Sequence, residues 1–330
     1  MSKNKFLVTF SPHIRDSLQT DKVMLNVIYA LIPAIAVSIY YFGFFALKTY
    51  ILTIIFTLAF EALFLKIRGR RITLDDNSAL VTAILLAMNL PPNSPWWLIL
   101  IGSFIAIVVG KQVFGGLGQN PFNPALVARV FLLISWPAQM TSWIKPTPII
   151  ENFNFDSVSA ATPLSQAKTE LISNGKIITD FSDFPAYFLG NIGGSLGEIS
   201  AIALILGGLY LIYKKIISWH IPVSYLLSFL LIVMPYWLFF PDKSLSPFIH
   251  LFTGGLMLGA FFMATDMVTS PITKKGQIIF GIGCGVLTAV IRLFGGYPEG
   301  VSFAILLMNA FVPLIDYYIR PKSLGEAEKV

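Results

Sequence analysis

Charged residues are scarce in this chain. Asp, Glu, Lys and Arg make up 12% of its 330 residues, whereas soluble domains carry about 25%. So few charges cannot cover a surface that faces water, and 55% of the residues are hydrophobic. The composition therefore excludes a soluble globular protein and a disordered one. It predicts an all-α integral membrane protein that crosses the bilayer many times.

Cysteine and histidine are also nearly absent. The single cysteine, Cys284, excludes a disulfide framework and a cysteine-ligated cluster held by this chain alone. Three histidines leave little for haem, and we predict no metal site. The net charge of +6 does not indicate a nucleic-acid partner, because membrane proteins concentrate Lys and Arg in their cytoplasmic loops.

About ten apolar segments can serve as transmembrane helices. They cover residues 23–43, 49–65, 77–91, 97–114, 121–138, 197–213, 219–240, 248–266, 277–294 and 301–319. Several are only about 15 residues long and contain Gly or Pro, although a helix needs about 20 residues to cross a bilayer. We therefore expect some of these helices to be broken or tilted and buried among their neighbours.

The positions of Lys and Arg predict the orientation. The N-terminal tail has neither the apolar core nor the cleavage site of a signal peptide. With this tail in the cytoplasm, most Lys and Arg residues fall in cytoplasmic loops, as the positive-inside rule requires. The prediction divides the chain into a cytoplasmic tail, a five-helix repeat, an extracytoplasmic loop, a second five-helix repeat and a cytoplasmic tail. These parts are 1–22, 23–138, 139–196, 197–319 and 320–330.

Two halves of the chain resemble each other. MNLPP (88–92) and GGLGQNPFNPALVARVFLL (115–133) correspond to ATDMVTSP (264–271) and GGYPEGVSFAILLMNAF (295–311). An odd number of helices in each half makes the repeats inverted, and broken helices in inverted repeats form binding sites where the breaks converge. We expect one polar pocket towards each face of the membrane. The alternative is that these Gly and Pro residues only permit close helix packing.

A few charged side chains fall within or beside the apolar segments. Arg129 lies inside a segment, where an unpaired charge costs roughly 2.5–3.5 kcal/mol, so it needs a partner. Glu61 is one candidate and a bound cofactor is another. Asp266, Glu299 and Asp316 lie near segment ends, where they can line a cation path or cap helices.

The long polar segment contains DSVSAATP (156–163). Pro163 biases Thr162 towards an extended backbone, which would present its hydroxyl on an exposed loop beside two alanines. From these residues alone an ordinary turn is the simpler interpretation.

This segment resembles the flavinylation motif of the RnfD/NqrB family, whose members are membrane subunits of the Rnf complex and of the sodium-pumping NADH:quinone reductase. Ser159, Ala160, Ala161 and Thr162 match the motif in order, and Asp156 occupies its acidic position. Ala160 and Ser157 stand where the family often has Gly. The resemblance extends along nearly the whole chain, through segments at 11–17, 76–92, 110–129, 262–273 and 295–309.

The resemblance implies two cofactors. FMN would be attached to Thr162 through a phosphoester by an extracytoplasmic flavin transferase, and riboflavin would be bound without a covalent bond within the membrane part. The expected FMN pocket on the outer side comprises Asn89, Gly295, Gly296, Tyr297, Pro298 and Glu299. The expected riboflavin pocket on the inner side comprises Asn120, Asn123, Thr265 and Asp266, although the two asparagines can instead cap a helix. Glu61, Arg129 and Asp316 are the candidates for a buried charge or an ion path.

The resemblance also implies a function. The chain would relay single electrons between these flavins in an ion-translocating ferredoxin:NAD⁺ oxidoreductase of a bacterial or archaeal cytoplasmic membrane, coupled to Na⁺ or H⁺ transport. Its partners would be the other Rnf subunits. It would be an enzyme subunit that is not catalytic alone. Two alternatives remain open: the quinone-reductase subunit, and a secondary transporter or channel without a redox centre.

Overall fold

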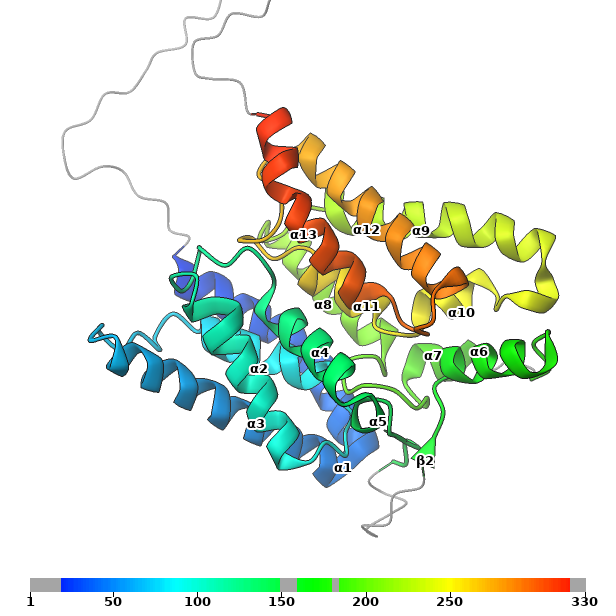
Figure 1. The fold of residues 1–330 in the computed structure, drawn as a ribbon, viewed down its shortest axis with the longest axis horizontal. Helices are drawn as coiled ribbons and strands as arrows, with labels where there is room; N and C mark the ends of the chain where they lie inside the picture. The colour runs from blue at the N-terminus through cyan, green and yellow to red at the C-terminus, as the bar shows by residue number, and fades with distance from the viewer. Residues whose placement is uncertain (1–18, 149–158, 180–183, 321–330) are drawn as a thin grey trace, which may run out of the picture.

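The structure, a computed structural model, describes residues 19–148, 159–179 and 184–320. It consists mostly of helices, arranged as a bundle (Figure 1). The α- and π-helices are α1 (Thr20–Ile67), α2 (Ser78–Met88), α3 (Trp96–Phe104), η1 (Ile105–Gln112), α4 (Pro124–Ser135), α5 (Pro137–Met140), α6 (Pro163–Asn174), α7 (Phe184–Leu189), α8 (Ala201–Tyr213), α9 (His220–Phe239), α10 (Pro247–Phe252), α11 (Leu256–Leu258), η3 (Gly259–Met263), α12 (Lys274–Phe294) and α13 (Val301–Tyr318). A short 3₁₀ turn, η2, spans Pro241–Lys243. Strands β1 (Trp143–Ile144) and β2 (Ser159–Ala160) pair antiparallel.

The 48-residue helix α1 is two helical segments joined at Gly43. Gly43 has φ 53° and ψ −127°, a conformation that glycine adopts readily and other residues rarely do. Ser38 and Tyr50 share a hydrogen bond of 3.0 Å, although residues 12 apart in a straight helix would be separated by about 18 Å. The chain therefore turns back at Gly43, the last residue of the first of the two segments predicted for this region.

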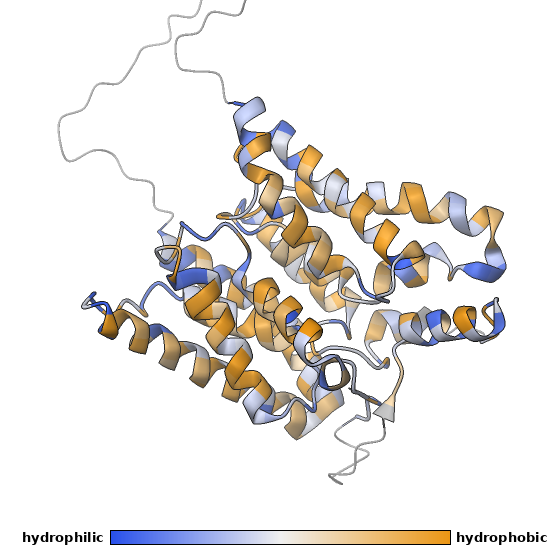
Figure 2. Ribbon diagram, viewed as in Figure 1, coloured by the Kyte–Doolittle hydropathy of each residue, from blue (hydrophilic) through white to orange (hydrophobic). Residues whose placement is uncertain are grey.

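Four helices among the described residues are long and apolar enough to cross a bilayer, and the bent pair Pro241–Phe252 and Leu256–Met263 makes up to five. Shorter apolar helices span Ser78–Met88, Trp96–Gln112, Pro124–Ser135 and Ala201–Tyr213. Hydrophobic residues predominate along most helices of the bundle (Figure 2), and many large ones are exposed, among them Leu231 (74%) and Phe239 (78%). Such a surface is suited to lipid, and the protein is a multi-pass membrane protein.

The predicted extracytoplasmic segment forms one end of the molecule. In Figure 1 the start of α1 and the end of α13 lie at the opposite end from β2, α6 and α7. The NH of Thr147 donates to the carbonyl of Tyr41 (3.1 Å), and the NH of Ile177 donates to that of Asp242 (2.8 Å). The polar segment is therefore packed onto the bundle where α1 turns back and where α9 ends.

Candidate functional site

A buried ionic cluster lies at the centre of the bundle. Arg129, in the second turn of α4, donates to the side-chain oxygen of Asn89 (2.5 Å) and to the carboxylate of Glu198 (3.2 Å). It also forms an ion pair with Glu299. Arg129 and Asn89 come from the first half of the chain and the two glutamates from the second. The predicted pairing of Arg129 with Glu61 is wrong, because Glu61 has a different partner.

That partner is Lys111, in the π-helix η1. Its ammonium donates to Glu61 Oε1 (2.9 Å) and to the Ser78 hydroxyl (2.8 Å), and the Gln112 amide donates to the same Glu61 oxygen (2.6 Å). Lys111 and Glu61 are each 2% exposed. No partner for Lys111 was predicted from the sequence, and this pair was missed. The available signal was one Lys and one Glu, each isolated within an apolar segment.

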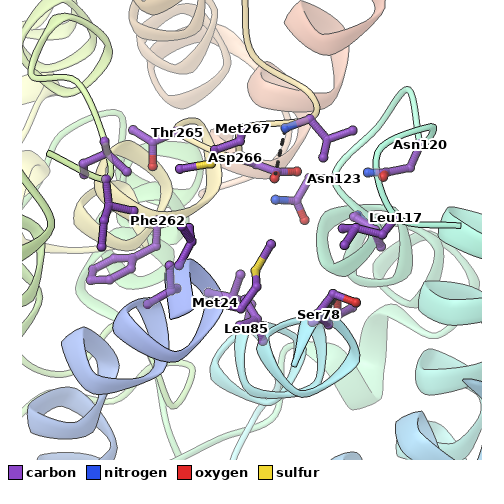
Figure 3. Close-up of a pocket in the computed structure, with 18 of the residues that line it drawn as sticks. Met24, Ser78, Leu85, Leu117, Asn120, Asn123, Phe262, Thr265, Asp266 and Met267 are labelled. Atoms are coloured by element: carbon purple, nitrogen blue, oxygen red, sulfur yellow. Dashed lines mark hydrogen bonds between the residues drawn. The ribbon is translucent and has the colours of Figure 1, made fainter. Parts of the chain in front are cut away.

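A pocket opens between the two halves near Lys111 (Figure 3). Its walls are largely apolar, and its polar lining includes all four residues predicted for the inner site: Asn120, Asn123, Thr265 and Asp266. Ser78 and Lys111 also line it. An apolar pocket with a few convergent polar groups is typical of ligand sites. The structure therefore brings together the residues predicted for the riboflavin site.

Polar atoms of this pocket also form hydrogen bonds that stabilise the structure around it. Asn123 Oδ1 accepts from the NH groups of Ala125 (3.1 Å) and Leu126 (3.4 Å). Asn123 is therefore the N-cap of α4, so the capping alternative is correct for this residue. Asp266 accepts from the NH of Val268 (3.4 Å) and the hydroxyl of Thr269 (3.1 Å). These bonds fix the turn after η3 and hold the carboxylate at the pocket wall.

The internal void of the pocket is about 80 Å³, smaller than the roughly 300 Å³ of typical ligand sites. Met24 and Met267 lie on its wall (Figure 3), and methionine side chains rearrange easily. A ligand of flavin size therefore requires these side chains to move.

Thr162 lies at the other end of the molecule, as the N-cap of α6. Its backbone is extended (φ −71°, ψ 151°), as predicted. Its hydroxyl accepts from the NH of Ser165 (3.1 Å) and donates to the Ser165 hydroxyl (2.8 Å). The side chain is 3% exposed, so the predicted exposed hydroxyl is wrong, because capping turns it towards the helix. Asp156 lies outside the described residues.

A groove of about 530 Å³ runs beside Thr162. It is lined by Ala160 and Ala161 of the motif, by the Ser165 face of α6, and by Gly296 and Pro298. The Lys168 ammonium donates to the carbonyls of Gly295 and Tyr297 (3.0 Å to Tyr297), which fixes this loop against α6.

On α6, hydrogen bonds from Thr179 and from the NH of Ile178 lower the pKa of Glu170 to about 2.

The residues predicted for the outer FMN pocket therefore lie in two separate places. Gly296 and Pro298 line the groove, and Gly295 and Tyr297 contribute carbonyls to Lys168. Asn89 and Glu299 instead line a small cavity at the central cluster, beside Arg129.

The three candidates for a buried charge or an ion path also lie in separate places. Glu61 pairs with Lys111, and Arg129 pairs with Glu198 and Glu299. Asp316 accepts from the NH of Ile272 (3.2 Å) and forms no ion pair among the described residues. These three residues therefore do not form one group.

The sequence matches a family model described as NQR2, RnfD, RnfE family, over residues 7–325. The chain belongs to this family. Among curated members of the family, the D subunit of the Na⁺-translocating ferredoxin:NAD⁺ oxidoreductase complex of Acetobacterium woodii is 48% identical over 98% of this chain and 97% of that protein. The D subunit of the ion-translocating oxidoreductase complex is 43% identical in Escherichia fergusonii and 42% in Escherichia coli K12, over 97% of this chain and 98% of each relative.

Proposed function

We propose that this chain is the flavin-carrying membrane subunit of an ion-translocating ferredoxin:NAD⁺ oxidoreductase complex, with the other subunits of that complex as its partners. The names of the relatives support the assignment to such a complex. The observation that most supports a flavin is the groove beside Thr162, because Ala160 and Ala161 of the proposed flavinylation motif line it together with Gly296 and Pro298.

FMN is proposed to be joined to Thr162 through a phosphoester. A helix N-terminus favours a phosphate group, because its free NH groups and the helix dipole attract negative charge. Thr162 occupies this position on α6, and the adjacent groove has the volume of a ligand site. Because the hydroxyl is buried, attachment by a flavin transferase requires Thr162 to leave its bonds with Ser165.

Riboflavin is proposed to bind in the inner pocket. Asparagine amides both donate and accept hydrogen bonds, which suits the edge of a flavin ring, and a ligand without phosphate needs no anion site there. The Lys111 ammonium, whose charge is paired with Glu61, also lies at this wall. A bound flavin accepts and passes on electrons, and the role of the chain is to hold and orient it. Electron relay would be coupled to the movement of Na⁺ or H⁺.

We propose that the ten apolar segments form two inverted five-helix repeats in a bacterial or archaeal cytoplasmic membrane. The turn at Gly43 supports two crossings within α1. The ends of α2 and η3 meet in the interior, where the Asn89 amide lies 3.7 Å from Met263 Sδ. This contact is expected for half-crossing helices that enter from opposite faces. Both termini would be cytoplasmic and the Thr162 segment extracytoplasmic.

Thr162→Ala tests the FMN proposal. We expect the variant to insert into the membrane but to carry no covalent flavin, because the acceptor oxygen is gone. The measurement is intact mass and in-gel flavin fluorescence after expression with an active flavin transferase. Ser165→Ala is the matched control, because it removes the hydroxyl partner and keeps the acceptor. Fluorescence that persists in Thr162→Ala, or an unmodified parent chain, would refute the attachment.

Asn120→Leu tests the riboflavin proposal. We expect less extractable, non-covalent flavin per chain, because the polar lining of the pocket is reduced. Asn191→Leu, at an exposed position outside the pocket, is the control. An equal ratio of extractable flavin to protein in both variants would rule out the inner pocket. A colourless protein with both sites intact would favour the secondary transporter.

A further inference from the structure

A second cavity lies at the same end of the bundle as Thr162, between α6, η2, α10 and the end of α12. Its volume is about 40 Å³, which is room for about three water-sized groups. Lys168, Lys243, His250 and Arg292 line it, and no acidic side chain is among its described lining residues. Three permanent cations therefore meet around one small space without a carboxylate.

Among the three permanent cations, Arg292 is the buried one. It is 5% exposed. Its two terminal nitrogens donate to the carbonyls of His250 (2.5 Å), Thr253 (3.0 Å) and Gly254 (2.7 Å). Its Nε has no hydrogen-bond partner among the described residues. It also has no ion-pair partner there, unlike Lys111 and Arg129. A buried charge normally has a counter-ion; Glu299 and Glu198 act on Arg292 only at longer range, and its direct contacts are carbonyl oxygens.

His250 adds a second unpartnered polar atom. Its side chain is buried, and Nδ1 has no partner among the residues that the structure describes. Its other ring nitrogen lies 3.4 Å from the Ser244 hydroxyl. Buried polar atoms in folded proteins are nearly always hydrogen-bonded. Both residues line the same cationic cavity, which favours a ligand that accepts hydrogen bonds.

Lys243 lies at the rim of the cavity, within an aromatic cluster. Its ammonium is 5.6 Å from the centre of the Phe240 ring, and Tyr236 packs against both Phe240 and Phe294. Phe294 is 67% exposed. Exposed aromatic rings at helix ends are typical of the membrane–water interface, which is also the level of phospholipid phosphates.

We propose that this cavity binds a phosphate group, with Arg292 and Lys243 as its principal donors and Lys168 and His250 completing the wall. Its size suits a compact oxyanion, and the cations that line it favour one. The phosphate can belong to an anionic phospholipid of the outer leaflet or can be free phosphate. Lys168 and Pro298 also line the groove beside Thr162, whereas Arg292, Lys243 and His250 line this cavity and not that groove.

The test uses the full chain, expressed without a flavin transferase, purified in detergent and stripped of lipid. Thermal melting is followed while inorganic phosphate is added, and in a separate series phosphatidylglycerol or phosphatidylcholine. Lys243→Gln removes one rim cation. Lys145→Gln makes the same charge change at an exposed position of the same end, outside the cavity. Lys243→Arg keeps the charge.

The parent chain is expected to be stabilised in a saturable way. Lys243→Gln should weaken the apparent affinity about tenfold, the effect of losing one charge-assisted hydrogen bond. Lys145→Gln and Lys243→Arg should stay near the parent. Stabilisation by phosphatidylglycerol but not by phosphate identifies a lipid headgroup, and stabilisation by phosphate alone identifies the free ion. Equal affinities for Lys243→Gln and Lys145→Gln, or no saturable effect of either probe, would overturn the proposal.

Discussion

At the scale of single residues, the pair formed by Lys111 and Glu61 is notable because both side chains are almost completely buried. Only one oxygen of Glu61 is used: Oε1 accepts from both Lys111 and Gln112, whereas Oε2 has no partner among the described residues. The network joins η1 to α1 and α2. Lys111 lies in a π-helix, and such segments are frequent at functional sites.

Breaking this pair from one side should be strongly destabilising. We expect Lys111→Met to lower the free energy of unfolding by about 3–5 kcal/mol, because it leaves the Glu61 carboxylate buried without a counter-charge. The double variant Glu61→Gln with Lys111→Met should recover most of the loss. Thermal melting in detergent measures both. Lys66→Met, at an exposed position of the same helix as Glu61, is the control, and an equal loss in the single and double variants would contradict the pairing.

The sequence could predict that isolated charges need partners but could not predict which ones. Glu61 and Arg129 were the obvious pair, because they stand out within their apolar segments. The choice depends on depth along each helix. Glu61 is joined through Lys111 to Ser78 at the start of α2, whereas Arg129 contacts Asn89 at the end of α2. A small shift in where a helix begins changes the depth of its side chains in the bundle. Hydropathy does not determine such shifts.

At the scale of elements, α9 and α12 pack unusually closely. Gly281 and Gly285 lie four residues apart on α12, the spacing that allows helix backbones to approach in membranes. A Cβ at Gly285 would overlap the Ser228 hydroxyl and the carbonyl of Tyr225, and it would lie 2.9 Å from the backbone nitrogen of Phe229. The backbone atoms of α9 cannot move away without moving the helix.

Gly285→Ala should therefore separate α9 and α12 and reduce the yield of folded chain. We expect a loss of stability at the upper end of the usual range of about 1–3 kcal/mol for overpacking. Gly283→Ala is the matched control: its Cβ would meet only the side chain of Met308, which is flexible and can move. Fluorescence-detected size-exclusion chromatography compares the two. Equal behaviour of both variants would show that the close approach of the backbones is unimportant.

Hydropathy was sufficient to locate most of these elements. Most helices fall within the predicted apolar segments, and the turn in α1 is at Gly43, the last residue of the first segment. Helices α6 and α7 instead lie in the segment predicted to be a polar loop. The π-helices η1 and η3 could not be predicted, because their residues are ordinary helix formers and the extra residue per turn is imposed by packing. The groove at Thr162 was also beyond prediction, since it depends on α6 docking against the distant loop of Gly296 and Pro298.

At the scale of the whole molecule, the central cluster joins the two halves of the chain. Arg129 of the first half binds Glu198 and Glu299 of the second, and the Asn123 amide donates to the carbonyl of Met263 (3.3 Å). Apolar contacts alone give little preference for one register between helices in lipid. The directional bonds of Arg129 therefore fix how the halves fit together.

Arg129→Met should loosen this junction. We expect a loss of about 3–5 kcal/mol, because two carboxylates would stay buried without their cation. Adding Glu299→Gln should recover part of it by removing one of the two negative charges. Thermal melting measures the stability, and Arg71→Met, at an exposed site on the connection before α2, controls for the loss of one positive charge. A melting temperature unchanged by Arg129→Met would show that the junction is apolar.

The positions of the start of α1 and the end of α13 limit how many times the chain can cross the bilayer. The start of α1 and the end of α13 lie at the same end of the bundle (Figure 1). A chain that begins and finishes on one side of a bilayer has traversed it an even number of times. In the proposed topology α1 supplies two of these traverses, because it turns back at Gly43. Adding or deleting a single traverse would move one terminus to the other compartment.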